Sequence, residues 1–253
     1  MLYTEIFDCH VHSTFSADGE STLQEMCEAA IRVGVSGLVF TDHIDTEKQE
    51  ILNTPAARKD YVATIDQIRQ HYGNSLTVLC GYELSAPHKN RQLCLELGGR
   101  EFDYSMISVH YGAPNIPLSS EREYVASYLQ EVEAAIQSGS FDVLGHIDLL
   151  RRFYGRFAYN AAQLENIYLI MRQKGMALEV NTHSLKKLSA ITKNDLEYVE
   201  LWKACGGKNI VLGSDAHVCR KIGGRFCDIL PLLPNGIEIG HYSNRTFIAD
   251  YIV

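Results

Sequence analysis

The sequence contains no apolar run that reaches the roughly 18 consecutive residues of a membrane-spanning helix, so we expect no such helix. Its first five residues also lack the basic and then apolar pattern of a secretory signal peptide. Only 6 of the 253 residues are proline and no stretch is of low complexity, which argues against a long disordered linker. Because 46% of the residues are hydrophobic and can form a core, we expect one domain that spans residues 1–253.

Paired cysteines and an excess of positive charge are also missing. The seven cysteines are odd in number and include no C-x-x-C pair, which favours free thiols in a reducing cytoplasm over a disulfide framework. We expect Cys9 to point to the opposite face of a strand from His10 and to pack in the core. The net charge of −8 argues against a nucleic-acid-binding surface.

Apolar runs typical of strands alternate with amphipathic stretches typical of helices along almost the whole chain. The expected strands are 5–9, 37–41, 76–80, 104–109, 141–144, 176–180 and 209–212. The expected helices are 22–33, 57–72, 121–137, 161–174 and 195–204, and several of them end at a glycine. Seven strands that alternate with helical stretches predict an α/β fold with a parallel, closed sheet.

What the chain does contain is histidine, clustered with carboxylates directly after short apolar runs. Four such clusters occur, at 8–12, 41–43, 145–148 and 214–217, and Glu83 and His110 follow strand-like runs in the same way. Imidazole and carboxylate are ligands of zinc, iron and manganese. All these positions lie at the carboxyl ends of expected strands, the face that carries the active site in (β/α) barrels. The sequence therefore predicts a multi-metal site built from the whole fold.

Several of these residues, taken alone, also have simpler interpretations. His10 alone is typical of a core histidine, and Asp18 alone of a turn, so the prediction depends on the whole set. Two other histidines, His71 and His241, are expected to face solvent on a helix and in a tail-like segment. His183 lies just past an expected strand end, where it either lines a substrate pocket or supports a ligand.

The ordered motifs D-x-H-x-H, T-D-H, G-x-E, S-x-H, G-H-x-D and S-D-A-H resemble the PHP (polymerase and histidinol phosphatase) superfamily, from Asp8 to His217. Within it, segments 10–19, 145–149 and 178–182 are most similar to those of stand-alone histidinol-phosphate phosphatases. The resemblance implies a distorted (β/α)7 barrel with a metal cluster at the carboxyl ends of the strands. It also implies three divalent ions, for which zinc, iron and manganese remain open.

The resemblance further implies how the ligands divide among the three ions. The first ion would be held by His10, His12, Glu83 and Asp215. The second would share Glu83 as a bridge and be completed by His110 and His146. The third would be held by Asp18, His43 and His217. Three more carboxylates would support the ligands or handle protons: Asp8, Asp42 and Asp148.

A metal cluster of this type suits the hydrolysis of a phosphate ester by a metal-bound hydroxide, because the ions also offset charge on the phosphate. The family likeness points to L-histidinol phosphate as the substrate, and so to a cytoplasmic enzyme of histidine biosynthesis. Asp18, His217 or a metal-bound water would protonate the leaving group. No G-x-S-x-G or P-loop pattern offers a different mechanism.

Basic residues are needed to hold the phosphate. The candidates for substrate contacts are Arg151, Arg152, Arg156, His183 and Lys186. Lysine stands at 186 in a segment where the resembling phosphatases often show arginine, which leaves another small phosphomonoester, a phosphodiester or a nucleotide open as the substrate. A metal-binding module without catalysis is the remaining alternative, and the pattern does not predict an oligomeric state.

Overall fold

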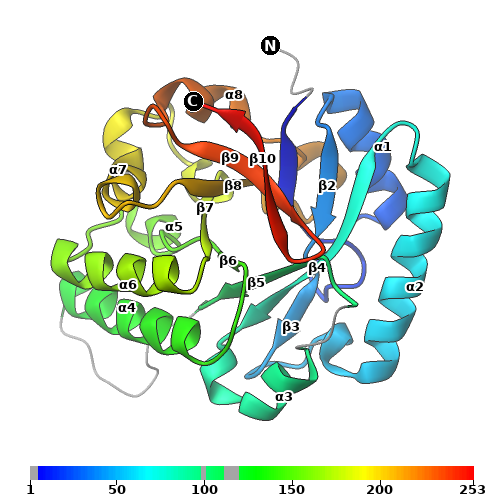
Figure 1. Cartoon of the computed structure of the whole chain (residues 1–253), viewed down its shortest axis with the longest axis horizontal. Coiled ribbons are helices and arrows are strands. Elements are labelled where there is room, and N and C mark those ends of the chain that lie inside the picture. The colour runs from blue at the N-terminus through cyan, green and yellow to red at the C-terminus, as the bar shows by residue number, and fades with distance from the viewer. Residues whose placement is uncertain (1–4, 98–100, 111–119) are drawn as a thin grey trace.

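One curled sheet runs through the described residues, 5–97, 101–110 and 120–253, of this computed structural model (Figure 1). Its strands follow the order β1-β2-β4-β5-β6-β7-β8-β9-β10, and β3 pairs with β4 beside this path. Their bounds are β1 Phe7–Val11, β2 Gly37–Phe40, β3 His43–Asp45, β4 Thr77–Ser85, β5 Tyr104–Ser108, β6 Val143–Leu144, β7 Ala177–Asn181, β8 Asn209–Gly213, β9 Glu238–Ser243 and β10 Thr246–Ile252. Pairings from β1 to β9 are parallel, and β10 is antiparallel to β9.

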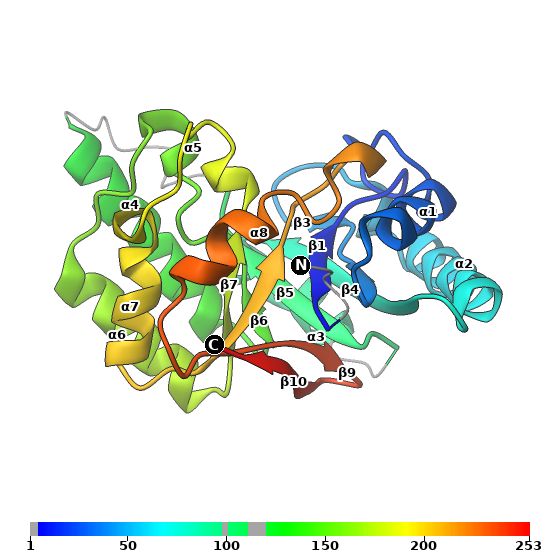
Figure 2. The same ribbon diagram turned by 90° about the horizontal axis from the view of Figure 1, so that it is seen from above.

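Helices cover the outside of this sheet, with α1 and α2 on one side and α4, α6 and α7 on the other (Figure 1, Figure 2). Their bounds are α1 Leu23–Val33, α2 Pro55–Tyr72, α3 Arg91–Glu96, α4 Glu121–Gln137, α5 Arg151–Tyr154, α6 Ala161–Gln173, α7 Glu197–Ala204 and α8 Phe226–Ile229. Two short 3-10 turns, η3 His183–Leu185 and η5 Cys219–Lys221, also matter for the site. Within the described residues, none of the helices combines the length and the apolar character that crossing a membrane requires.

The first helix, α1, shows how the local sequence sets helix ends. Thr22 caps its N-terminus by accepting the N–H of Glu25, and the Glu25 side chain bonds back to the N–H of Thr22. Gly34 ends the helix in left-handed backbone with φ of 84°, which glycine adopts without strain. Met26 and Ala30 on its inner face are fully buried, so the helix is held mainly by packing on the sheet.

Strand side chains alternate between the inside of the barrel and the helical layer outside. The inner apolar cluster takes one or two residues from each of most strands: Phe7, Cys9, Val39, Leu79, Tyr104, Met106, Val143, Ala177, Val211 and Tyr242. A larger cluster joins the opposite strand faces to the helices. Cys9 is fully buried inside, which confirms the prediction that it packs in the core.

The barrel closes at the carboxyl ends of its strands. A parallel bridge joins Val11 to Ala216, so the end of β1 lies beside the segment that follows β8. Two backbone hydrogen bonds flank this bridge, from Asp215 N–H to the His10 carbonyl at 2.8 Å and from His12 N–H to the Ala216 carbonyl at 2.9 Å. The expected distorted (β/α) barrel is confirmed, and its closure brings the first and last histidine clusters together.

Three strands, β3, β9 and β10, are not among those predicted from the sequence. Glycine and histidine interrupt the apolar pattern of β9, so it lacks the continuous run that marks a buried strand. The expectation that His241 faces solvent is wrong, because His241 is buried in β9, stacks on Phe7 with ring centroids 3.7 Å apart and bonds Asp250 at 2.8 Å. His71 is exposed, as expected.

Candidate metal centre

Glu83 lies where the histidines of the site converge. It is part of β4 rather than following it as expected, since β4 continues five residues beyond the predicted end at Cys80. Its Oε2 lies within 3.5 Å of nitrogen atoms of His10, His12 and His43. Its Oε1 lies 2.8 Å from Nε2 of His146 and 3.4 Å from Nε2 of His110. The two oxygens of one fully buried carboxylate therefore face two groups of imidazoles.

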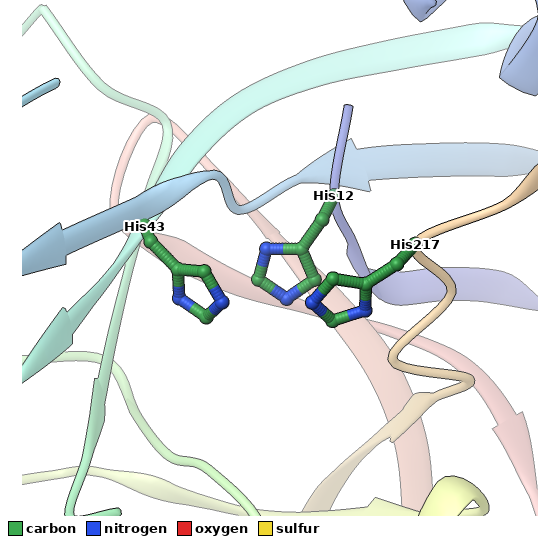
Figure 3. Close-up of side chains that lie close together, drawn as sticks. All are labelled: His12, His43 and His217. Atoms are coloured by element: carbon green, nitrogen blue, oxygen red, sulfur yellow. The ribbon is translucent and has the colours of Figure 1, made fainter. Parts of the chain in front are cut away.

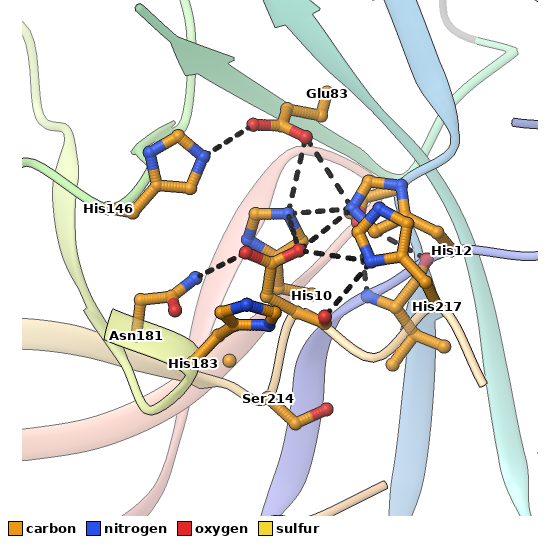
Figure 4. Close-up of polar contacts among 12 residues, drawn as sticks. His10, His12, Glu83, His146, Asn181, His183, Ser214 and His217 are labelled. Carbon is orange, nitrogen blue, oxygen red and sulfur yellow. Dashed lines mark hydrogen bonds and ion pairs between the residues drawn. The ribbon is translucent and has the colours of Figure 1, made fainter. Parts of the chain in front are cut away.

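His10 and His12 turn the same way at the end of β1, as their two-residue spacing predicts. Their Nε2 atoms are 2.9 Å apart (Figure 4). Asp215 Oδ1 lies 3.7 Å from Nε2 of His10 and 3.4 Å from Nε2 of His12. Asp215 has left-handed backbone with φ of 52°, which is uncommon for a residue other than glycine. Such local backbone strain concentrates at functional sites, and here it turns the carboxylate toward the imidazoles.

A third group of imidazoles comes from three separate segments. His12, His43 and His217 point toward one another, with ligand nitrogens that all lie within 4.8 Å (Figure 3). The Asp18 carboxylate closes this group from the solvent side, 3.6 Å from Nε2 of His43 and 3.3 Å from Nε2 of His217. All nine residues predicted as ligands therefore gather at one place.

The electrostatics of the cluster are those of a cation site. Burial acts to raise the pKa of Glu83, but the nearby His10 and His43 hold the pKa of Glu83 well below its usual range. For His43, the Glu83 carboxylate outweighs burial and raises the pKa to about 9. Two imidazole nitrogens only 2.9 Å apart, with His146 Nε2 2.8 Å from the same Glu83 carboxylate, form a donor set that fits divalent ions.

Two of the three carboxylates predicted to support the ligands, Asp8 and Asp42, hold the segments around the cluster, whereas the third, Asp148, accepts a hydrogen bond from the Arg151 side chain. Asp8 accepts the N–H groups of Ser214 and Gly223, and burial raises its pKa to about 6. Asp42 accepts hydrogen bonds from the hydroxyls of Ser13 and Ser16. These contacts fix the segment before Asp215 and the turn after β1, because each buried carboxylate satisfies two donors.

A cavity of about 420 Å³ opens beside the cluster, a size typical of small-molecule sites. Five of the predicted ligands line it: Asp18, His43, His110, Asp215 and His217. Its basic residues are Lys48, Arg152, His183 and Lys221. Its other lining residues are Asp45, Glu50, Leu149 and Phe153.

The structure separates the predicted substrate residues into two sets. Arg152 and His183 line the cavity, and the Lys186 ammonium contacts His183 Nε2. Arg151 points away to Asp148 and Asp195, at 3.2 and 3.0 Å. Neighbouring residues on a helix differ by about 100° in direction, so Arg151 and Arg152 do not face the same cavity.

Arg156 also lies apart from the cavity. Its exposed guanidinium makes two hydrogen bonds to Glu121, at 3.0 and 2.8 Å, next to the start of α4. The structure therefore gives no support for phosphate contacts by Arg151 or Arg156.

Several residues of the site were not predicted. Lys221 and Glu50 reach the cavity from η5 and from the segment before α2, where no sequence motif marks them. Glu179 is fully buried under the cluster, with an oxygen 2.7 Å from His10 Nδ1. A carboxylate in the expected buried strand 176–180 was the available signal, since a buried charge needs a partner.

Comparisons with known proteins agree with this geometry. The family model of the PHP domain matches residues 8–183, and the chain belongs to this family, as the motifs predict. A probable histidinol-phosphatase of Deinococcus radiodurans is 31% identical over 244 residues, covering 89% of this chain and 91% of that protein. One of Clostridium acetobutylicum is 26% identical, covering 91% and 93%.

A solved structure shows the same fold. It is the histidinol phosphate phosphatase of Lactococcus lactis, in complex with zinc, L-histidinol and phosphate. The TM-score is 0.77 at 23% identity, and the alignment covers 96% of this chain and 99% of that one.

Proposed function

We propose that this protein is a metal-dependent phosphomonoesterase that hydrolyses L-histidinol phosphate to L-histidinol and phosphate. The observation that carries the proposal is Glu83, whose two oxygens face two groups of imidazoles at the edge of a cavity that also contains Arg152. The names of the relatives support L-histidinol phosphate as the substrate. The convergence of all nine predicted ligands supports metal-dependent hydrolysis. We treat residues 1–253 as one catalytic domain and place its reaction in the cytoplasm.

Three divalent ions fit the ligands that the structure brings together. We assign the first to His10, His12, Glu83 and Asp215. We assign the second to Glu83, His110 and His146. We assign the third to Asp18, His43 and His217. Such ions lower the pKa of a bound water and offset charge on phosphate oxygens, and zinc, iron and manganese all suit these ligands.

Arg152 is the residue we assign to the phosphate. Its guanidinium lines the cavity and donates a hydrogen bond of 2.6 Å to Asp215 Oδ2, so it sits directly beside the cluster. A planar guanidinium matches two phosphate oxygens at once. His183 and Lys221 add polar and positive groups to the same cavity, with Lys186 in contact with His183.

Proton transfer to the leaving group is assigned to the pair of Asp18 and His217. Their side chains approach to 3.3 Å at the mouth of the cavity, where Asp18 is largely exposed. This contact holds the pKa of Asp18 below its usual range and raises the pKa of His217. Because both side chains are also assigned to the third ion, a water held at that site would supply the proton to the departing alkoxide, and Asp18 and His217 would orient it.

A chain of contacts also links Arg152 to the ligands at the mouth of the cavity. Arg152 contacts Asp215, Asp215 lies 3.5 Å from His217, and His217 contacts Asp18. The next residue back, Ala17, donates its N–H to Glu50 at 3.1 Å. Glu50 lines the same cavity as Arg152 without contacting it, and we assign its carboxylate as the partner of the ammonium group of histidinol.

The experiment that tests the proposed function is phosphate release by purified protein loaded with zinc or manganese. L-Histidinol phosphate is compared with a panel of small phosphomonoesters and one phosphodiester. We expect the highest kcat/KM on L-histidinol phosphate. Equal or better turnover of the panel, with L-histidinol phosphate near background, would assign the protein to a different substrate while leaving the metal chemistry in place. No release from any substrate would overturn the catalytic proposal.

A further inference from the structure

We propose that Glu179 is a positioning residue, which holds His10 and the backbone at His146 so that two of the proposed metal ions find their ligands already oriented. This inference rests on the metal centre of the proposed function but not on the identity of the substrate. Glu179 belongs to neither the predicted ligands nor the substrate contacts. It approaches the centre from inside the barrel, on the side opposite the cavity.

The alternation of β7 puts Glu179 inside the barrel. Ala177 belongs to the inner apolar cluster, and Glu179 is two residues further along the same strand, so it shares that face. It lies closer than Ala177 to the carboxyl ends of the strands, between the inner apolar cluster and the histidines. Its side chain is fully buried, and a buried carboxylate is tolerated only where donors satisfy it.

The donors that satisfy Glu179 come from two other strand ends. His10 Nδ1 donates to Oε1 at 2.7 Å, and the backbone N–H of His146 donates to Oε2 at 2.5 Å. The Asn181 amide adds a bond to Oε1 at 3.1 Å. One carboxylate thus ties the end of β1 to the turn after β6.

The bond to His10 decides which nitrogen faces the metal centre. An ionised carboxylate only accepts hydrogen bonds, so His10 Nδ1 carries a proton and Nε2 is left to bind a cation. That Nε2 faces Glu83 Oε2 at 3.3 Å and His12 Nε2 at 2.9 Å. Glu179 therefore sets both the orientation and the ligand atom of His10.

Gly213 at the end of β8 makes room for this pair. A Cβ at Gly213 would lie 2.0 Å from Glu179 Oε1 and 2.6 Å from His10 Cβ, closer than any real contact. Its φ is not in the left-handed region, so the backbone itself does not require glycine there. Glycine is required at this position because the Glu179–His10 pair occupies the space that any side chain would fill.

A merely structural role is the competing explanation, and Asp142 provides the matched control. Asp142 is also a buried carboxylate of the barrel, and it accepts hydrogen bonds from Ser105 N–H and Oγ at 2.8 Å. It precedes β6 at the amino end and touches none of the predicted ligands. Glu179→Gln and Asp142→Asn each remove one buried charge, but only the first changes contacts of the metal centre.

The test measures zinc affinity, by competition with a chelator, and metal-free thermal stability for both variants. We expect Glu179→Gln to bind zinc about 10- to 100-fold more weakly than the unaltered protein, while Asp142→Asn binds it normally. Unchanged zinc affinity in Glu179→Gln, or an equal loss in Asp142→Asn, would overturn the inference. If Glu179→Gln does not fold, Glu179→Asp serves instead, because it keeps the buried charge but draws the carboxylate back from His10 by about one methylene length, and the same loss of zinc affinity is expected.

A spectroscopic readout separates this inference from the proposed function. In zinc-loaded protein labelled with nitrogen-15 histidine, we expect His10 to show a protonated Nδ1 and a metal-bound Nε2. Zinc bound through Nδ1 would overturn the role of Glu179 even if the enzyme hydrolyses L-histidinol phosphate. If the enzyme prefers another substrate, both readouts remain valid, because neither depends on turnover.

Discussion

At the scale of single residues, the site depends on Glu83, because its two oxygens face separate groups of imidazoles. We expect Glu83→Ala to abolish phosphate release and to lower the amount of bound metal, since the shared ligand of two ions is lost. Metal content by elemental analysis and turnover check this. Glu121→Ala, far from the centre in a surface pair with Arg156, is the control. Full activity of Glu83→Ala would refute the assignment of the cluster.

The phosphate contact is tested by replacing Arg152, with Arg156 as the control. We expect Arg152→Ala to raise KM for a phosphomonoester about tenfold or more, because one charge-assisted hydrogen bond to the phosphate is lost. The metal content should change less. Arg156→Ala should leave KM unchanged, because Arg156 is bonded to Glu121 instead. Steady-state kinetics decide between them. A KM unaffected by both changes would direct attention to Lys186 and Lys221.

Glu50 tests the recognition of the amine. Glu50→Gln keeps the size of the side chain but removes the charge that would face an ammonium group. We expect KM for L-histidinol phosphate to rise about tenfold, while KM for a phosphomonoester without an amine stays the same. An equal rise for both substrates would mean that Glu50 acts through the Ala17–Asp18 turn and not on the amine.

At the scale of elements, the strands of the barrel and the convergence of the ligands could be predicted from the sequence. Parallel strands bring their carboxyl ends to one edge, so residues such as His10 and Asp215 meet although about 200 positions separate them. The hairpin of β9 and β10 could not be predicted, because its pattern lacks a continuous apolar run. Arg151 and Arg152 were equally good candidates, since only the direction of α5 decides which one faces the cavity.

The β9–β10 hairpin gives a prediction of its own. His241 packs on Phe7 of β1 and bonds Asp250 of β10, so it joins the hairpin to the barrel. We expect His241→Ala to lower the free energy of unfolding by about 1–3 kcal/mol, because Asp250 loses its partner and the Phe7 ring loses its contact. Denaturant unfolding measures this, with the exposed His71→Ala as the control. An unchanged midpoint for His241→Ala would show that the hairpin is held by other contacts.

At the scale of the whole molecule, the metal centre makes stability depend on pH differently with and without metal. The pKa of His43 is raised from 6.5 to about 9 in the metal-free fold, so its stabilising contribution is complete below pH 6.5 and is lost as the pH rises through 9. Burial raises the pKa of Asp8 from 3.8 to about 6, which acts in the same direction at lower pH.

We therefore expect the metal-free protein to lose stability between pH 6.5 and 9. The zinc-loaded protein should not show this loss, because its ligand nitrogens hold zinc and not protons, so the stabilisation that zinc adds should grow over the same range. Thermal unfolding at several pH values, with and without a chelator, checks both signs. Parallel curves for the two forms would contradict the proposed ligands.

The closure of the barrel between Val11 and Ala216 also has a consequence for how the protein is made. The earliest ligands, His10 and His12, emerge from the ribosome long before Asp215 and His217 are synthesised. A nascent chain therefore lacks a complete donor set for either of the two ions assigned to Asp215 and His217. Loading of those two sites must follow the synthesis of His217 and depends on the metal available to the folding chain at that stage.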